Sequence, residues 1–161
     1  DNRDLNEIVA EMLLQGGITI AIAESCTGGL ISAKLTDIPG ISEVFNRGII
    51  SYSDQSKVEN LHVNKGTLER FGAVSSEAAI EMAKGVRKIS GTDLGLAVTG
   101  IAGPDGGSPE KPVGLVYVAL ASGDGVETKE LRLWGSRTRI RNVTSLHAFD
   151  IIRRKLIDMK N

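Results

Sequence analysis

A short apolar run that gives way abruptly to polar residues and glycines constrains the fold of this chain more than any other feature. Ile18–Ala23 has the length and the β-branched content of a buried strand. Glu24-Ser25-Cys26-Thr27-Gly28-Gly29 follows it directly, and Leu30–Leu35 then shows a helical pattern. A strand, a glycine-containing turn and a helix in this order are typical of an α/β protein.

The same alternation of buried strands and amphipathic helices continues along the chain. We expect strands over Ile18–Ala23, Arg47–Ser53, Leu94–Thr99, Val113–Ala121 and Glu127–Leu133. We expect helices over Leu5–Leu13, Leu30–Leu35, Ser53 or Asp54 to Leu61, Lys65–Phe71, Ser75 or Ser76 to Ile89, and Arg137–Met159. Gly123-Asp124-Gly125 predicts a hairpin between the last two strands. This order predicts a three-layer α/β/α sandwich around a mixed sheet of about five strands.

Composition narrows the class of protein further. A length of 161 residues predicts one domain over 1–161. The chain has 19 Lys and Arg against 20 Asp and Glu, so the basic surplus of a nucleic-acid-binding protein is absent. One cysteine excludes an intrachain disulfide, and with only two histidines we expect no metal site. Because no apolar run reaches membrane-spanning length, we expect a cytoplasmic protein with no membrane partner.

The turn after the first predicted strand is a candidate active site, because ligands of open α/β sheets bind at the carboxyl ends of the strands. Gly28 and Gly29 allow the backbone to approach a ligand closely, and the next helix offers unpaired N–H groups at its start. Ser25 or Cys26 is a candidate nucleophile, with nearby N–H groups as an oxyanion hole. Alternatively, Ser25 or Thr27 caps the helix and Cys26 packs in the core.

A second polar segment, Tyr52 to Lys57, follows the second predicted strand and should reach the same edge of a parallel sheet. Lys57 falls in the first turn of a short helix, where the helix dipole disfavours a cation. If Lys57 is also buried, its pKa should fall and the neutral amine could serve as a general base for a serine. The alternative is an ordinary surface lysine.

Two further segments are candidates for binding an anion. The glycine-rich stretch from Thr99 to Gly107 also leaves a strand end, although its spacing matches neither a Rossmann fingerprint nor a P-loop. Its glycines suit a backbone cradle for a phosphate or an oxyanion, or else a flexible connection. Arg137, Arg139 and Arg141 open the last helix, where cations oppose the dipole, and arginine is a common phosphate ligand. A solvated basic face is the alternative.

Five segments together resemble the CinA C-terminal domain family, the nicotinamide-nucleotide amidases of the PncC type. They are Ala23–Gly29, the Gly48-x-x-x-Tyr52-Ser53-x-x-x-Lys57 pattern, Gly72–Ser75, Thr99–Pro104 and Glu110–Gly114. They occur in family order and extend the resemblance from about Leu5 to Leu156. Gly135-Ser136-Arg137 departs from the Gly-Asp-Arg sequence associated with this family.

The resemblance implies hydrolysis of the carboxamide of nicotinamide mononucleotide to nicotinate mononucleotide and ammonia. It also implies Ser25 as nucleophile, Lys57 as base and a helper role for Tyr52, with no metal or organic cofactor. The implied substrate contacts are Glu24, Cys26, Thr27, Gly28, Gly29, Thr99, Gly100, Arg137 and Arg141. We expect Arg141, ahead of Arg137, to bind the substrate phosphate. We also expect a homo-oligomer whose partner is a small nucleotide and not a nucleic acid.

Two other interpretations stay open at this point. One is an amidase in which Cys26 is the nucleophile, with Lys57 and Glu24 as in nitrilase-like sets. Adjacent residues on a tight turn point apart, so Ser25 and Cys26 cannot both face the substrate. The other is a non-enzymatic role as a nucleotide-binding or competence-associated interaction module.

Overall fold

A single mixed sheet organises the protein, in a computed structural model that describes residues 3–161. Its strands are β1 (Ile20–Glu24), β2 (Phe45–Ile50), β3 (Leu94–Gly100), β4 (Leu115–Ser122) and β5 (Gly125–Arg132). They lie in the order β2-β1-β3-β4-β5. β1 pairs in parallel with β2 and β3, whereas β3, β4 and β5 pair antiparallel. The predicted mixed sheet with a terminal hairpin is confirmed.

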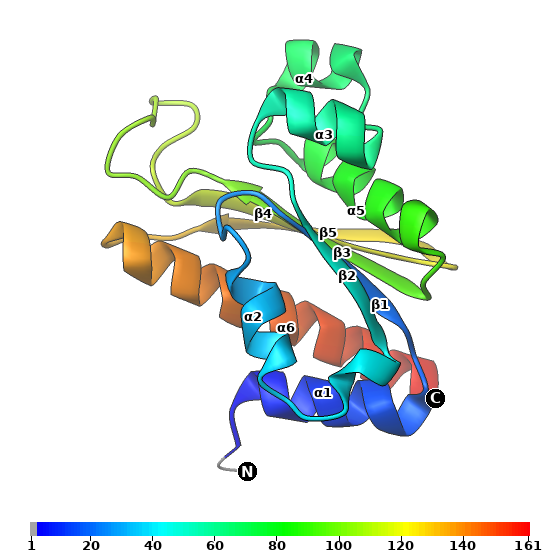
Figure 1. The fold of residues 1–161 in the computed structure, drawn as a ribbon. Helices are drawn as coiled ribbons and strands as arrows, with labels where there is room; N and C mark the ends of the chain where they lie inside the picture. Colours follow the sequence, from blue (N-terminus) through cyan, green and yellow to red (C-terminus); the bar gives the residue numbers. More distant parts are fainter. Residues whose placement is uncertain (1–2) are drawn as a thin grey trace.

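Helices cover both faces of this sheet. They are α1 (Leu5–Gly16), α2 (Leu30–Thr36), α3 (Asp54–Leu61), α4 (Lys65–Phe71), α5 (Ser76–Ser90) and α6 (Arg137–Lys160). Figure 1 shows α1, α2 and α6 on one face, and α3, α4 and α5 on the other. The three-layer α/β/α sandwich is therefore confirmed.

Alternation along the strands divides the core into two parts. In β1, Ile20 and Ile22 pack in the cluster beneath α1, α2 and α6, whereas Ala21 and Ala23 pack in the cluster beneath α5. Small residues on the second face allow α5 to lie close to the sheet. At Gly95 of β3, an added Cβ would lie only 2.4 Å from a carbonyl oxygen of α5.

Several element boundaries differ from the predicted ones, and one short element was not predicted. β2 ends at Ile50 and not at Ser53, because its register with β1 ends there and Ser53 leaves the sheet to cap α3. β4 begins at Leu115 and not at Val113, because Gly114 has a φ of +96°, which breaks the extended backbone. A short 3₁₀ helix over Ile41–Glu43 was not predicted.

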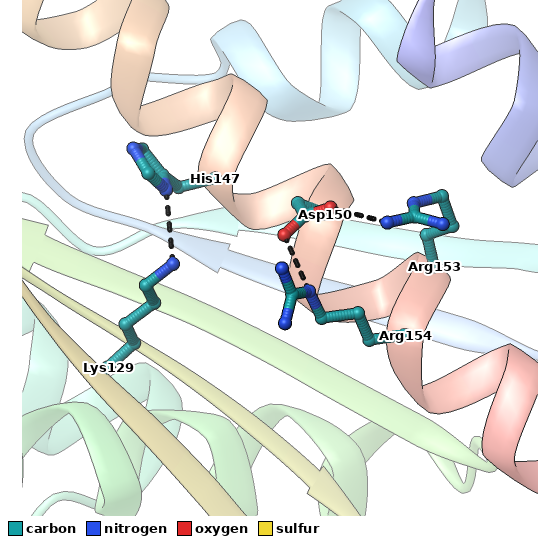
Figure 2. Close-up of polar contacts among 5 residues, drawn as sticks. All are labelled: Lys129, His147, Asp150, Arg153 and Arg154. Atoms are coloured by element: carbon teal, nitrogen blue, oxygen red, sulfur yellow. Dashed lines mark hydrogen bonds and ion pairs between the residues drawn. The ribbon is translucent and has the colours of Figure 1, made fainter.

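A polar network joins the outer surface of α6 to β5 (Figure 2). Asp150 accepts hydrogen bonds from Arg153 Nη2 at 3.0 Å and from Arg154 Nε at 2.9 Å. Lys129 Nζ lies 3.5 Å from His147 Nδ1. Burial and the neighbouring Lys129 charge both lower the pKa of His147. The contact therefore favours a neutral imidazole that accepts from the lysine.

Candidate active site

A small cavity lies where β1, β2 and β3 end, and it contains the predicted nucleophile and base. Its volume is about 200 Å³, and its lining is contributed by four loops, the end of β3, the start of α3 and the start of α6. The lining residues are Ser25, Cys26, Tyr52, Lys57, Ala73, Val74, Thr99, Gly100, Ala102 and Arg137. Segments that are far apart in the sequence thus meet at the carboxyl edge of the parallel strands, as expected for an α/β sheet.

The two residues at the end of β1 serve opposite faces of the sheet. Glu24 lies two residues after Ile22, so its side chain is on the same face of the sheet, and its carboxylate reaches α2. The side chain of Ser25, the next residue, lies on the opposite face, and its hydroxyl reaches Lys57 of α3. Strand alternation therefore selects Ser25 as the residue that faces the cavity beside α3.

Lys57 is a fully buried lysine placed against Ser25. Only 1% of its surface is exposed, and Nζ lies 3.1 Å from Ser25 Oγ. Nζ also donates to the backbone carbonyl oxygens of Ser51 at 2.9 Å and Tyr52 at 3.1 Å. The predicted burial and the predicted contact with Ser25 are both present.

The surroundings of Lys57 favour its neutral form. Burial lowers its pKa, and the opposing influences of Asp54 and Cys26 do not cancel that effect. A neutral amine has two N–H donors and one lone pair. Two carbonyl oxygens accept from it, so the third direction is available to accept the Ser25 O–H. Such an arrangement is chemically able to transfer the hydroxyl proton to the amine.

Cys26 lines the same cavity, but its environment opposes thiolate formation. The residue is 6% exposed, and burial raises the pKa of its thiol to about 11. Because the thiolate is the nucleophilic form, this thiol is poorly suited to attack a carboxamide near neutral pH.

The α2 N-terminus does not offer the free N–H groups that the sequence predicted. Glu24 Oε1 accepts from the amides of Gly29 at 3.2 Å and Ile31 at 3.0 Å, and Oε2 accepts from the amide of Ser32 at 2.9 Å. Gly28 N–H donates to Ser25 O at 3.0 Å. The internal carboxylate occupies the anion site of this helix, so the prediction of phosphate contacts from Gly28 and Gly29 amides is corrected.

Glu24 and Thr27 are both fully buried. The Thr27 hydroxyl donates to Glu24 Oε1 at 2.6 Å, and the Ser32 hydroxyl donates to Oε2 at 2.7 Å. Neither Glu24 nor Thr27 contributes to the lining of the cavity. Their side chains fix the turn formed by residues 25–29, here called the Ser25 turn, and do not line the cavity.

Arg137 closes one side of the cavity. Its Nη1 donates to Gly103 O at 2.8 Å, and its Nη2 donates to the Tyr52 hydroxyl at 3.1 Å. The Tyr52 side chain is 60% exposed, whereas its carbonyl oxygen binds Lys57. Ser136 caps α6 by accepting from the amide of Arg139, so the serine at the unusual position in Gly135-Ser136-Arg137 still starts the helix.

Arg141 is placed differently from the prediction. It does not line the cavity, and its guanidinium donates to Cys26 O at 3.1 Å and to Thr27 O at 2.7 Å. Arg137 lines the cavity and Arg141 does not, which is the opposite of the expected order. Both arginines lie near the start of α6, but only the first turn of that helix reaches the cavity.

The end of β3 forms the opposite wall. Thr99 and Gly100 both line the cavity, and the Thr99 hydroxyl donates to Ala73 O at 2.8 Å. A Cβ at Gly100 would lie 2.9 Å from Leu115 O, so the close approach of β4 requires glycine there.

Sequence reasoning missed several backbone groups of this site. The carbonyl oxygens of Ser51, Tyr52 and Gly103 hold the side chains of Lys57 and Arg137, and Ala73, Val74 and Ala102 complete the walls. Backbone carbonyls carry no residue-type signal, so only a three-dimensional arrangement reveals them.

A larger cavity lies outside the site. Its volume is about 620 Å³, and it lies between α3 and α4 and does not include Ser25. Within residues 3–161, no group of three or more His, Cys, Asp and Glu side chains is arranged to hold a metal ion. Over the same residues, no helix is both long enough and apolar enough to cross a membrane.

Comparison with known proteins places the chain in a family. The model of the CinA C-terminal domain matches residues 2–156. The chain belongs to this family. The segments that resemble CinA C-terminal domains in the sequence include those that meet at the cavity.

Relatives of this CinA C-terminal domain extend across bacteria. A protein from Acetivibrio thermocellus, whose name includes the words competence-damage inducible protein, is 65% identical over 99% of this chain and 39% of its own length. The chain thus spans about two fifths of that relative. The solved structure of the competence/damage inducible protein CihA from Agrobacterium tumefaciens is 42% identical, with a TM-score of 0.88 over 94% of this chain and 96% of that one. A CinA superfamily protein from Klebsiella pneumoniae is 30% identical, with a TM-score of 0.92 over 97% and 99%.

Proposed function

We propose that this CinA C-terminal domain is an amidase that hydrolyses the carboxamide of nicotinamide mononucleotide. The observation that carries the proposal is the buried Lys57 amine, whose two carbonyl acceptors leave one direction for the Ser25 hydroxyl at 3.1 Å. The family resemblance supplies the substrate, and the serine–lysine pair supplies the chemistry.

In the first half-reaction, Ser25 Oγ attacks the carboxamide carbon while its proton moves to Lys57 Nζ. The electron pair of the carbonyl double bond moves to the carbonyl oxygen, which becomes an oxyanion. When the C=O bond reforms, the C–N bond breaks. The departing nitrogen takes the proton from the Lys57 ammonium and leaves as ammonia.

In the second half-reaction, water hydrolyses the ester that links the acyl group to Ser25. Lys57, neutral again, takes a proton from the attacking water and returns it to Ser25 Oγ as the ester bond breaks. The product is nicotinate mononucleotide, and both side chains return to their starting protonation states. No redox step or additional reactant besides water is required.

Substrate recognition is assigned to the cavity and its rim. A volume of about 200 Å³ suits the pyridine ring and its carboxamide more than an entire nucleotide, which places the ribose and phosphate at the opening. Arg137 lies at that opening, and its bonds to Gly103 and Tyr52 use only two of the five guanidinium N–H donors. We assign the phosphate to Arg137.

The deciding experiment measures ammonia release from nicotinamide mononucleotide by the wild-type protein, Ser25→Ala and Cys26→Ala. Wild-type protein should release ammonia, and Ser25→Ala should lose activity by about 10⁴-fold or more because it removes the nucleophile. Cys26→Ala should retain substantial activity. All three should show the same circular dichroism spectrum, which excludes misfolding as the cause.

The same experiment separates the competing functions. Loss of activity in Cys26→Ala with activity retained in Ser25→Ala would assign the nucleophile to the thiol. A folded wild-type protein that releases no ammonia would refute the amidase and favour a nucleotide-binding or interaction module.

A further inference from the structure

Arg141 ends on the backbone of the Ser25 turn, where it contacts main-chain atoms and not the cavity. Its Nε and Nη2 donate to the carbonyl oxygens of Cys26 and Thr27, at 3.1 and 2.7 Å. Nη2 would lie 3.4 Å from a Cβ at Gly28, so the guanidinium packs directly on this residue. One side chain of α6 thus holds two consecutive peptide groups that follow Ser25.

These bonds determine which way the next amides point. In a planar trans peptide, a C=O and the N–H of the following residue point in opposite directions. With the carbonyls of Cys26 and Thr27 held toward α6, the N–H groups of Thr27 and Gly28 point away from it. Gly28 N–H donates to Ser25 O at 3.0 Å, so the peptide orientation that Arg141 holds also closes the turn onto Ser25.

We propose that Arg141 is a positioning residue whose two hydrogen bonds hold the Ser25 turn in the conformation that places the Ser25 hydroxyl beside Lys57. This inference rests on the amidase function proposed above. Gly28 N–H reaches Ser25 O only while the Thr27 carbonyl faces α6, because the two groups belong to one peptide. Ser25 Oγ in turn lies 3.1 Å from Lys57 Nζ, so a shift of the turn would separate the hydroxyl from the amine.

The charge of Arg141 also acts on this turn. Burial raises the pKa of the Cys26 thiol, and the Arg141 guanidinium opposes that rise. Negative charge that develops beside Cys26 is therefore stabilised by the same group that fixes the peptide. Arg137 differs, because its donors lie at the rim and contact no atom of the Ser25 turn.

Arg141→Lys provides the kinetic test, because it keeps the charge but cannot reproduce two bonds from one planar guanidinium. We expect kcat for nicotinamide mononucleotide to fall by about 10- to 100-fold, as for a misplaced nucleophile, with KM within twofold of wild type. Arg139→Lys is the matched control, since Arg139 lies on the same helix but contacts Trp134, and its kinetics should stay at wild-type values. A raised KM with unchanged kcat would overturn the proposal and make Arg141 a substrate ligand.

Hydrogen exchange of backbone amides tests the same inference without any reaction. In Arg141→Lys, the amides of Thr27 and Gly28 should exchange faster than in wild type, while those of β3 keep their rates. Unchanged exchange in the Ser25 turn would overturn the positioning role. Should the lysine variant not fold, Arg141→Gln, which keeps one donor, takes its place. Absence of ammonia release by the wild-type protein would instead refute the amidase, so the two failures are distinguishable.

Discussion

Glu24 and Ser25 are neighbours in the chain, yet their side chains act on opposite faces of the sheet. Glu24 accepts three backbone amides and two hydroxyls around α2, while Ser25 meets Lys57 of α3. The end of β1 therefore carries a structural carboxylate on one face of the sheet and a candidate nucleophile on the other. This relationship separates what stabilises the turn from what reacts on it.

Glu24→Gln should destabilise the fold without touching the cavity. The glutamine has one acceptor oxygen, and its NH₂ group would face donors that the carboxylate now satisfies. We expect the free energy of unfolding in urea to fall by about 2–4 kcal/mol, because bonds to a buried charged group are lost. Glu43→Gln, at an exposed position, should change it by less than about 0.5 kcal/mol. Equal effects of the two substitutions would contradict the role assigned to Glu24.

The pH dependence of the reaction should report Lys57. Because burial lowers the Lys57 pKa, kcat/KM should rise with pH through one ionisation below the ordinary lysine value of about 10.4. The charge of Asp54 raises this pKa, so Asp54→Asn should move the rise to lower pH. Glu59→Gln, on the exposed side of α3, serves as the control and should not shift the profile. A shift to higher pH in Asp54→Asn would be inconsistent with Lys57 as the base.

The free energy of unfolding should also depend on pH through the lowered pKa of Lys57. Where the folded Lys57 pKa lies below the unfolded one, the unfolded chain binds more protons between the two values, so stability rises with pH through that window. The slope for one proton is at most about 1.4 kcal/mol per pH unit. Comparing urea unfolding of the wild type and Lys57→Met from neutral pH to pH 10 should show this rise in the wild type alone. Parallel curves would mean that the lysine keeps its ordinary pKa.

Gly95→Ala should test the close packing of α5 on the sheet. The new methyl would lie 2.4 Å from Ala83 O and 3.0 Å from the Arg87 amide nitrogen, both backbone atoms. We expect a loss of about 1–3 kcal/mol in the free energy of unfolding, the range for overpacking. Gly123→Ala is the matched control, because its methyl would find no heavy atom closer than 3.9 Å. Thermal unfolding of both variants gives the comparison.

The contact between β5 and α6 should be visible in a histidine titration. Burial and Lys129 lower the pKa of His147, so Lys129→Met should raise it. The imidazole proton shifts in NMR spectra measure this pKa directly. Lys88→Met, on the opposite face of the sheet, should leave it unchanged. No change in Lys129→Met would show that the 3.5 Å contact does not persist in solution.

Sequence periodicity predicted the layers and the arrival of the Ser25 and Lys57 segments at one edge of the sheet, whereas the pairing of the two side chains followed from the family resemblance. Strands β1 and β2 end in polar segments, and parallel strands bring such segments to one edge. Alternation along β1 could also have assigned Glu24 to the α2 face, because it shares the parity of Ile20 and Ile22. That signal was present in the sequence but was not applied to the polar residue.

The choice between the arginines of α6 could not be made from sequence. Arg137 and Arg141 are four residues apart, so both project from nearly the same side of the helix, one turn from each other. Which turn reaches the cavity depends on where α6 starts relative to the sheet, and that is set by tertiary packing. For the same reason, the sequence did not reveal that backbone carbonyls receive the donors of Lys57.

The contacts around the Ser25 turn divide the site into parts of different mobility. Glu24, Lys57 and Arg141 hold this turn from three directions through buried or half-buried groups. The contact between Arg137 and the Tyr52 hydroxyl instead joins two exposed side chains, for which water competes. Exposed side chains at the rim rotate within about picoseconds to nanoseconds, and such rotations break no contact of the Ser25 turn. The backbone that carries the reacting hydroxyl can remain stationary throughout.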